Sequence, residues 1–219
     1  MLIMNIENIY YINLSSRTDR NIHMKKQLYN LGWKGERVEA IELENGRVGC
    51  TLSHIKCLKM AIEKQLDYIV ILEDDIHFLN PSVFKENFHH CLNTLSNWDV
   101  ILIAGNNIRP YTRINDSCVK IVNTQTTTGY MVKNHYFSIL LNNIKEGLTY
   151  LLKNPEIHSK FAIDRYWFSL QEKDNWYLIT PLTVSQLQGY SNIEERETNY
   201  TQLMLMLDKP YFKLLNKIN

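Results

Sequence analysis

The feature that most constrains the fold is an uninterrupted apolar run that ends in three carboxylates. Residues 68–72 read YIVIL, and Glu73, Asp74 and Asp75 follow directly. A continuous apolar run of this length is typical of a strand that is buried on both faces of a mostly parallel sheet. Such sheets belong to α/β proteins, in which helices cover both faces. We therefore expect an α/β fold with a mostly parallel central sheet.

The rest of the chain alternates between strand-like and helix-like segments, as such a fold requires. Strands are expected at residues 9–14, 68–72, 100–104, 120–122, 130–132 and 176–180. Helices are expected at residues 20–31, 52–66, 81–95, 136–152 and 161–171, the first ended by Gly32. The polar residues 191–201 indicate a loop. The apolar residues 203–207 indicate a C-terminal helix that packs on the core or on a second subunit, so a homodimer is one possible arrangement.

Length and charge limit the classes of protein that fit. A chain of 219 residues is the size of one domain, and it shows no repeat or linker, so residues 1–219 are expected to form a single domain. Twenty-four basic and 23 acidic residues give a net charge of +1, which provides no broad field for holding nucleic acid. The four cysteines show no CxxC spacing and are expected to be reduced and mostly buried.

No segment of the sequence has the pattern of a targeting signal or a membrane span. The first 14 residues lack a basic region and a small-residue cleavage site. No stretch approaches the roughly 18 apolar residues that a membrane span needs. A cytoplasmic protein is the resulting expectation, in the host cytoplasm if the source is viral.

The three carboxylates after residue 72 indicate a metal site. Like charges this close raise one another's pKa, and a divalent cation reverses that effect. Ligands of open α/β sheets bind at the carboxyl ends of the strands, where this cluster lies. Hard carboxylate oxygens suit Mg²⁺ or Mn²⁺, whose other ligands often come from substrate phosphates. The pattern leaves sugar transfer, nucleotidyl transfer and phosphate-ester hydrolysis open, although no GxxxxGK phosphate loop is present.

Several short motifs, in order along the chain, resemble those of glycosyltransferase family 25. This family includes lipooligosaccharide galactosyltransferases and collagen hydroxylysine galactosyltransferases. The matching segments are Ile12-Asn13-Leu14 with Arg17 and Arg20, Gly49-Cys50-x-x-Ser53-His54, Ile71-Leu72-Glu73-Asp74-Asp75, Trp98-Asp99-Val100-Ile101, Thr128-Gly129-Tyr130, Ile163-Asp164-x-Tyr166-Trp167, and Pro181, Gln186 and Ser191-Asn192-Ile193. The chain departs from the family pattern in lacking an alanine after Gly129 and in having Asn192 in place of an aspartate.

The resemblance implies a GT-A type, Rossmann-like fold that uses a UDP-hexose and Mn²⁺ or Mg²⁺. Residues 1–105 would bind the nucleotide sugar and the metal, and residues 106–219 would bind the acceptor. Asp75 and Glu73 would hold the metal, and Asp74 would contact the ribose or the donor sugar. The other donor-binding candidates are Asn13, Arg17, Arg20, Ser53, His54, Gly129 and Gln186.

Some of these candidates also have structural interpretations. Arg17 and Arg20 suit phosphate oxygens, but they could instead belong to a solvated, helix-capping loop. Ser53 and His54 share a helix face of small residues, so His54 could be a buried histidine satisfied by a backbone carbonyl. Gly129 would allow close approach to the sugar or an unusual dihedral, or simply a turn.

Asp164 is the catalytic candidate. In an inverting transfer, a carboxylate takes the proton from the acceptor hydroxyl, and Trp167 would offer an apolar platform for a sugar ring. In a retaining enzyme, Asp164 would instead hold hydroxyl groups of the acceptor or donor. A surface ion pair with Arg165 is the structural alternative.

Two acceptors are consistent with the resemblance. One is the galactosyl-hydroxylysine of a collagen-like protein, which would make the enzyme a glucosyltransferase. The other is a lipopolysaccharide or lipooligosaccharide that receives galactose. A protein of another class, a non-catalytic module that binds nucleotide sugar or glycan, remains an alternative.

Overall fold

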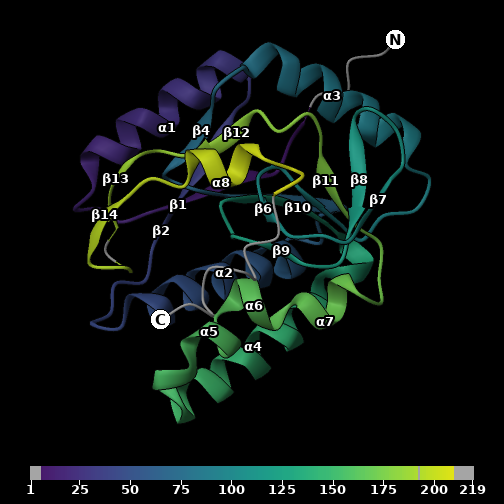
Figure 1. Ribbon diagram of the computed structural model, residues 1–219. Coiled ribbons are helices and arrows are strands. Elements are labelled where there is room, and N and C mark those ends of the chain that lie inside the picture. Colours follow the sequence, from purple (N-terminus) through teal and green to yellow (C-terminus); the bar gives the residue numbers. More distant parts are fainter. Residues whose placement is uncertain (1–5, 192, 210–219) are drawn as a thin grey trace, which may run out of the picture.

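An eight-stranded mixed sheet lies at the centre of the computed structural model, which describes residues 6–191 and 193–209 (Figure 1). Its strands are β1 (Ile9–Asn13), β2 (Gly35–Glu39), β3 (Tyr68–Glu73), β5 (Val100–Leu102), β7 (Tyr111–Arg113), β8 (Cys118–Ile121), β10 (Gly129–Lys133) and β11 (Trp176–Ile179). Their spatial order is β2-β1-β3-β10-β5-β11-β8-β7. Six of the eight strands run in the same direction, and β10 and β8 are antiparallel to their neighbours. The expected α/β fold with a mostly parallel sheet is confirmed.

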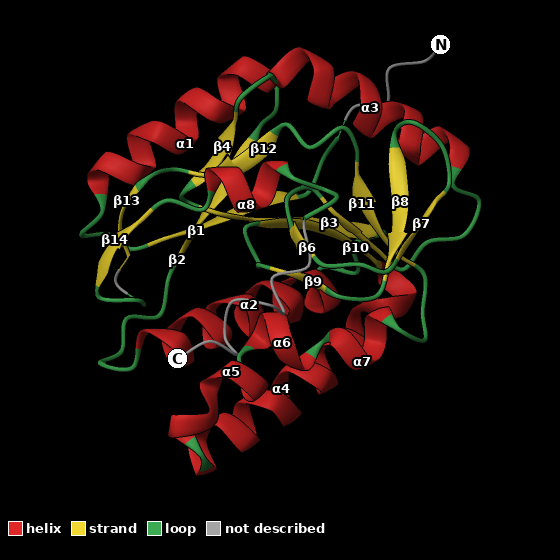
Figure 2. Ribbon diagram, viewed as in Figure 1, coloured by secondary structure: helices red, strands yellow, loops and turns green. Residues whose placement is uncertain are grey.

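Helices cover both faces of this sheet (Figure 2). Helices α1 (Thr18–Leu31) and α3 (Pro81–Thr94) lie on one face, and α2 (Gly46–Glu63) and α4 (Phe137–Lys153) lie on the other. Gly32 ends α1 as predicted. Its φ of 67° is left-handed, and its N–H donates to carbonyls of the last turn.

The alternation of side chains along β3 explains why its sequence is apolar throughout. Val70 and Leu72 pack into the core shared with α1 and α3, whereas Ile69 and Ile71 pack into the core shared with α2 and α4. All four side chains are fully buried. The strand therefore joins two hydrophobic cores, and its carboxyl end opens onto the edge of the sheet where β1 also ends.

Short elements gather around that edge. Strand β4 (Ile76–Phe78) pairs with β12 (Val184–Gln186), β6 (Asn106–Asn107) pairs with β9 (Thr124–Gln125), and β13 (Gly189–Ser191) pairs with β14 (Arg196–Thr198). The β13–β14 pair corrects the expected loop at residues 191–201, although Asn192 lies outside the described residues.

The expected helix at residues 161–171 is broken into several short helices. They are the end of α5 (His158–Phe161), α6 (Ile163–Tyr166) and α7 (Phe168–Gln171). Two further short helices, η2 (Pro155–Ile157) and η1 (Asn134–Tyr136), precede α5 and α4 respectively. Ala162 interrupts the run with an extended backbone, with φ −57° and ψ 146°. The break lets Ile163 and Trp167 pack into the core beneath the sheet.

The last described helix is α8 (Thr201–Leu205), which packs on the core. Its Met204 is fully buried among residues of the core that α1 and α3 share. The first of the two packing arrangements expected for this segment is therefore the observed one. Among the described residues, no helix combines the length and apolarity needed to cross a membrane.

Candidate functional site

The carboxyl ends of β1 and β3 bring Asn13 and the acidic cluster together. Asn13 Nδ2 donates to Asp74 Oδ2 at 2.7 Å, and Arg20 Nη1 donates to Asp74 Oδ1 at 2.9 Å. The same Arg20 nitrogen lies 3.4 Å from Asp75 Oδ2. Arg20 Nη2 also donates to the carbonyl of Tyr190 in β13. The side chain of Arg20 thus joins the acidic cluster to the strand that lies over it.

Asn13 is held from its other side by Arg37, a residue that sequence reasoning missed. Arg37 Nε donates to Asn13 Oδ1 at 2.8 Å, and Arg37 Nη2 donates to the Asn13 carbonyl at 3.2 Å. Both ends of the Asn13 amide are therefore used within the protein. Asn13 also lines the smaller of the two cavities at this edge, so it positions Asp74, and contact of its amide with the donor stays a prediction. No local sequence pattern marks Arg37, because the contact depends on the pairing of β1 with β2.

Arg17 lies at the start of α1 and lines a cavity at this edge. Its guanidinium pairs with Asp19 at 2.9 Å, and the hydrogen bond from Arg17 lowers the pKa of Asp19 to about 2. Asp19 is well exposed, so the pair adds little to stability.

Glu73 carries three hydrogen bonds on a single oxygen. Its Oε1 accepts from Thr127 Oγ1 at 2.6 Å, and it lies 3.3 Å from His54 Nε2 and 3.7 Å from Cys50 Sγ. Burial acts to raise the pKa of Glu73, but the bonds from His54, Thr127 and Cys50 hold it below its ordinary value. Glu73 Oε2 has no hydrogen-bond partner in the part of the chain that the structure describes. Glu73 is thus an oriented anion with one oxygen available.

Ser53 and His54 are both buried in α2. The Ser53 hydroxyl donates to the Gly49 carbonyl and accepts from the Ile41 N–H, both at 2.8 Å. Its hydrogen bonds are therefore made inside the protein, although Ser53 also lines the smaller cavity, and its contact with the donor stays a prediction. His54 Nδ1 lies 2.8 Å from the Tyr130 hydroxyl, so the ring is satisfied by side chains rather than by the backbone carbonyl that was expected.

Asp75 has the features of a metal ligand. Its Oδ1 is buried and has no hydrogen-bond partner among the described residues. Burial, together with the charges of Glu73 and Asp74, raises the pKa of Asp75 to about 7 despite the opposing charge of Arg20. An unpartnered carboxylate oxygen beside other carboxylates is a donor set that fits Mg²⁺ or Mn²⁺.

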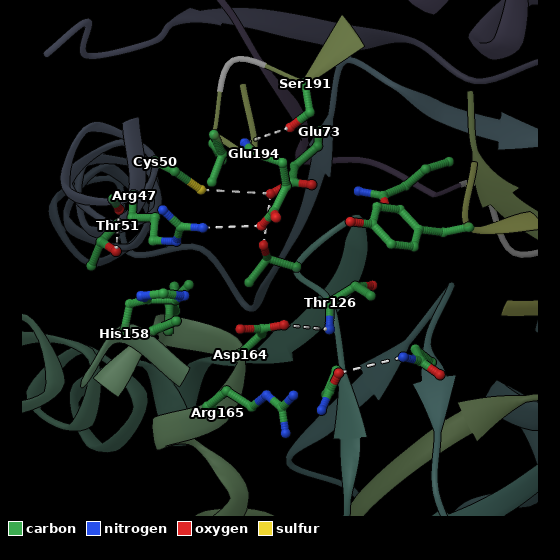
Figure 3. Close-up of a pocket in the computed structure, with 18 of the residues that line it drawn as sticks. Arg47, Cys50, Thr51, Glu73, Thr126, His158, Asp164, Arg165, Ser191 and Glu194 are labelled. Atoms are coloured by element: carbon green, nitrogen blue, oxygen red, sulfur yellow. Dashed lines mark hydrogen bonds and ion pairs between the residues drawn. The ribbon is translucent and has the colours of Figure 1, made fainter. Parts of the chain in front are cut away.

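Asp164 lies across the cleft, at the start of α6 (Figure 3). Its Oδ2 accepts from the Thr126 N–H at 3.1 Å, and burial raises the pKa of Asp164. Thr126 has a φ of 80°, which is strained for a β-branched residue, and its hydroxyl is buried without a partner among the described residues. Thr127, the next residue, holds Glu73. The run TQTTT before Gly129 is the one sequence signal that could have marked these threonines.

Packing bears on the roles expected for Gly129 and Trp167. Gly129 lies within β10 opposite Leu72, and an added Cβ would come within 2.7 Å of Ile76 Cδ1. Its small size therefore serves core packing, and its contact with a sugar stays a prediction. Trp167 is fully buried, and its Nε1–H donates to the Thr124 carbonyl, so it cannot be a platform for a sugar ring.

Two cavities meet at this edge of the sheet. One of about 300 Å³ is lined mainly by residues from the first third of the chain, including Arg17, Arg20 and the acidic cluster. The other, of about 350 Å³, is lined mainly by later residues, including Asp164. Residues that line both cavities are Cys50, Glu73, Gln186, Ser191 and Ile193. Gln186, expected at the donor site, thus lies at the junction.

An ion pair crosses the larger cavity. Arg47 Nη2 at the start of α2 lies 3.1 Å from Glu194 Oε1, in the segment that joins β13 to β14 (Figure 3). This pair and the bond from Arg20 to Tyr190 attach the β13–β14 segment to the rim from two helices.

The family profile and the curated relatives that match this chain point to the same protein family. The sequence profile of glycosyltransferase family 25, described as an LPS biosynthesis protein, matches residues 37–164, which is more than half of the chain. The chain is similar to procollagen galactosyltransferase 1-B of Xenopus laevis, with 27% identity over 133 residues, covering 46% of this chain and 21% of that protein. It is also similar to inactive glycosyltransferase 25 family member 3 of Mus musculus, with 21% identity over 199 residues, covering 74% of this chain and 31% of that protein. The chain thus spans less than a third of the length of these relatives.

One solved structure matches most of the fold. It is a glycosyltransferase involved in the glycosylation of the major capsid of PBCV-1, with a TM-score of 0.50 and 12% identity, covering 85% of this chain and 95% of that one. At this identity the likeness concerns the fold alone, and it supports the GT-A type architecture expected from the sequence.

Proposed function

This chain belongs to glycosyltransferase family 25, and we propose that it transfers a hexose, glucose or galactose, from a UDP-sugar to a hydroxyl of a glycan acceptor. The main support from the geometry is that the two cavities meet at Glu73, with Asp75 on one side and Asp164 on the other. A donor and an acceptor could therefore lie in neighbouring cavities and react at the junction. The halves 1–105 and 106–219 would bind the donor and the acceptor respectively.

The smaller cavity suits the donor. Asp75 and the free oxygen of Glu73 would hold Mn²⁺ or Mg²⁺, and Arg17 and Arg20 would face the diphosphate. When bound, the metal would supply Lewis-acid stabilisation of the UDP leaving group. Asp74, fixed by Asn13 and Arg20, would contact the ribose or the donor sugar.

Asp164 would act at the acceptor. A carboxylate whose pKa is raised by burial is a stronger base than an exposed one, and it can accept the proton of the attacking hydroxyl. The Thr126 N–H fixes one of its oxygens, which leaves the other for the acceptor. This is the role for an inverting transfer; in a retaining enzyme, Asp164 would hold substrate hydroxyls.

The acceptor we prefer is galactosyl-hydroxylysine of a collagen-like protein, with glucose as the transferred sugar. The support is that several relatives carry the name procollagen galactosyltransferase, which favours a collagen-like acceptor but names galactose as the transferred sugar. The description of the family as an LPS biosynthesis protein supports the alternative, galactose transfer to a lipopolysaccharide. A relative named inactive keeps a non-catalytic sugar-binding module as a second candidate function.

Release of UDP would test these functions. The protein would be incubated with Mn²⁺, a panel of UDP-sugars, and galactosyl-hydroxylysine peptide or lactose-type acceptors. We expect one donor to turn over faster with one acceptor, and Asp75→Ala to abolish that turnover. Asp164→Asn should lower kcat by about 10²- to 10⁴-fold, whereas Asp116→Asn, at a fully exposed aspartate, should have no effect. UDP binding without turnover under any pairing would favour the binding module.

A further inference from the structure

We propose that Cys50, His54 and Glu73 form a second metal site, selective for a soft divalent cation such as Zn²⁺, which lies beside the carboxylate site at Asp75 and shares Glu73 with it through the other carboxylate oxygen. The three ligand atoms are Cys50 Sγ, His54 Nε2 and Glu73 Oε1, and all lie within 4.8 Å of one another. Two of the separations, 3.3 Å from Nε2 to Oε1 and 3.7 Å from Sγ to Oε1, are close to those on a tetrahedral ion. Zinc bonds of about 2.0–2.3 Å place tetrahedral ligands about 3.3–3.6 Å apart.

The site is built on regular elements. Cys50 and His54 are four residues apart in α2 and therefore lie on the same face of the helix. Glu73 is the last residue of β3, so its position is set by the sheet. Ligands on helices and strands are held more precisely than ligands on loops.

Outer partners hold two of the three ligands. The Tyr130 hydroxyl lies 2.8 Å from His54 Nδ1, and Thr127 Oγ1 donates to Glu73 Oε1 at 2.6 Å. Metal-binding histidines nearly always use their second nitrogen in this way, and metal-binding carboxylates are themselves hydrogen-bonded. Both partners are already placed in the protein without a metal.

A cation can reach the site. Cys50 and Glu73 line both cavities, and His54 lines the smaller one. Three protein ligands with one side open to a cavity leave a fourth position for water or a substrate atom. A closed structural zinc site would lack such an opening.

Binding of the cation involves a defined exchange of protons. The Cys50 thiol releases its proton to solvent, since a coordinating thiol is deprotonated. His54 must present an unprotonated Nε2, so Nε2 gives up the proton that it donates to Glu73 without a cation, and Nδ1 takes up a proton and donates it to the Tyr130 oxygen. Burial raises the pKa of the Cys50 thiol, so without a cation the thiol stays neutral and donates to Glu73. A soft cation therefore replaces the hydrogen bonds from His54 and Cys50 to Glu73 Oε1. In their place it forms one bond to each of the three side chains.

Selectivity follows from the ligands. Thiolate and imidazole favour Zn²⁺ and Co²⁺, whereas Mg²⁺ and Mn²⁺ prefer the oxygen ligands at Asp75. If the proposed transfer reaction is correct, zinc at this site would inhibit it, because Glu73 and the junction of the two cavities would be taken. The binding itself does not depend on that reaction.

Cobalt absorption tests the site directly. We expect Co²⁺ to give a thiolate-to-cobalt band in the near ultraviolet, together with the visible bands of a tetrahedral ion. Both bands should vanish in Cys50→Ser. They should persist in Cys57→Ala, because Cys57 is fully buried and is not one of the three proposed ligands. Zn²⁺ should displace the cobalt, and Mg²⁺ should not. No band in the unmodified protein, or the same band in Cys50→Ser, would overturn the proposal.

Two further measurements keep the test independent of folding and of the transferase reaction. In the unmodified protein, Zn²⁺ should slow alkylation of Cys50, as followed by mass spectrometry, whereas Mg²⁺ should not; equal labelling would count against the site. Tyr130→Phe should weaken zinc binding by about 10- to 100-fold. Asp75→Asn should keep the cobalt band while losing UDP release, so failure of the proposed function and failure of the metal site give different results.

Discussion

The amide of Asn13 donates to Asp74 at 2.7 Å and accepts from Arg37 at 2.8 Å, so one side chain orients the acidic cluster from behind. Replacing Asn13 with alanine would leave Asp74 Oδ2 and the Arg37 Nε–H without these partners. We expect the free energy of unfolding to fall by about 1–3 kcal/mol, as measured by urea denaturation. Asn142→Ala, at an exposed position of α4, should change it by less than about 0.5 kcal/mol. Equal losses in the two variants would show that Asn13 has no special role.

Stability without metal should depend on pH through Asp75. Its folded pKa of about 7 lies above the ordinary value of 3.8, so the folded protein binds more protons than the unfolded chain between about pH 4 and pH 7. The free energy of unfolding in EDTA should therefore fall as pH rises through this range, by up to about 1.4 kcal/mol per unit from this group, and then level.

Asp75→Asn should flatten that slope, since the amide does not titrate. Asp116→Asn, at a fully exposed carboxylate, should keep the slope of the unmodified protein. Denaturant titrations at several pH values would measure both. If Asp75→Asn left the pH dependence of the unfolding free energy unchanged, the pKa of Asp75 would not be raised by burial.

Relief of strain at Thr126 should stabilise the protein. A β-branched residue at a φ of 80° stores about 1–2 kcal/mol, whereas glycine adopts this conformation freely at an entropic cost of about 0.5–1 kcal/mol. Thr126→Gly is therefore expected to raise the free energy of unfolding by about 0.5–1 kcal/mol. Thr112→Gly, in the exposed strand β7 and at negative φ, should lower it instead. A loss at both positions would show that the Thr126 backbone is not strained.

A methyl group at residue 129 should disturb the turn that carries the acidic cluster. The added Cβ of Gly129→Ala would lie 2.7 Å from Ile76 Cδ1 and 3.2 Å from Leu72 Cδ2, and overpacking of this kind costs about 1–3 kcal/mol. Gly189→Ala is the matched control, because its Cβ would meet no described atom within 4 Å. Thermal unfolding of both variants would measure the difference. A Gly129→Ala protein with an unchanged melting temperature would argue against tight packing around residue 129.

The elements that sequence reasoning placed correctly are those with strong local signals. The apolar run of β3 and the left-handed Gly32 at the end of α1 depend only on nearby residues. The segment expected to be helical at residues 161–171 is helical apart from Ala162 and Trp167, but it is not one continuous helix, because packing of Ile163 and Trp167 into the core interrupts it at Ala162. Tertiary packing overrode the local pattern there.

In the candidate site too, local motifs were predictive and contacts set by tertiary packing were not. Motifs located the carboxylates and Asp164, but they could not show which other side chains hold these residues in position. Arg37 and Thr127 act through hydrogen bonds to residues 24 and 54 positions away, and such contacts are set by strand order. The expectation for Trp167 was wrong because its burial, which excludes a role as a sugar platform, is not visible in a motif.

The distances along the chain between the paired site residues also bear on how the protein assembles. Asn13 meets Asp74 across 61 positions, Thr127 meets Glu73 across 54, and Thr126 meets Asp164 across 38. Each contact closes a long loop, whose entropy must be lost before the contact can form. During synthesis, a chain that has emerged only as far as α4 contains the acidic cluster but not Asp164. The two sides of the cleft can therefore come together only after the chain has been made through residue 164.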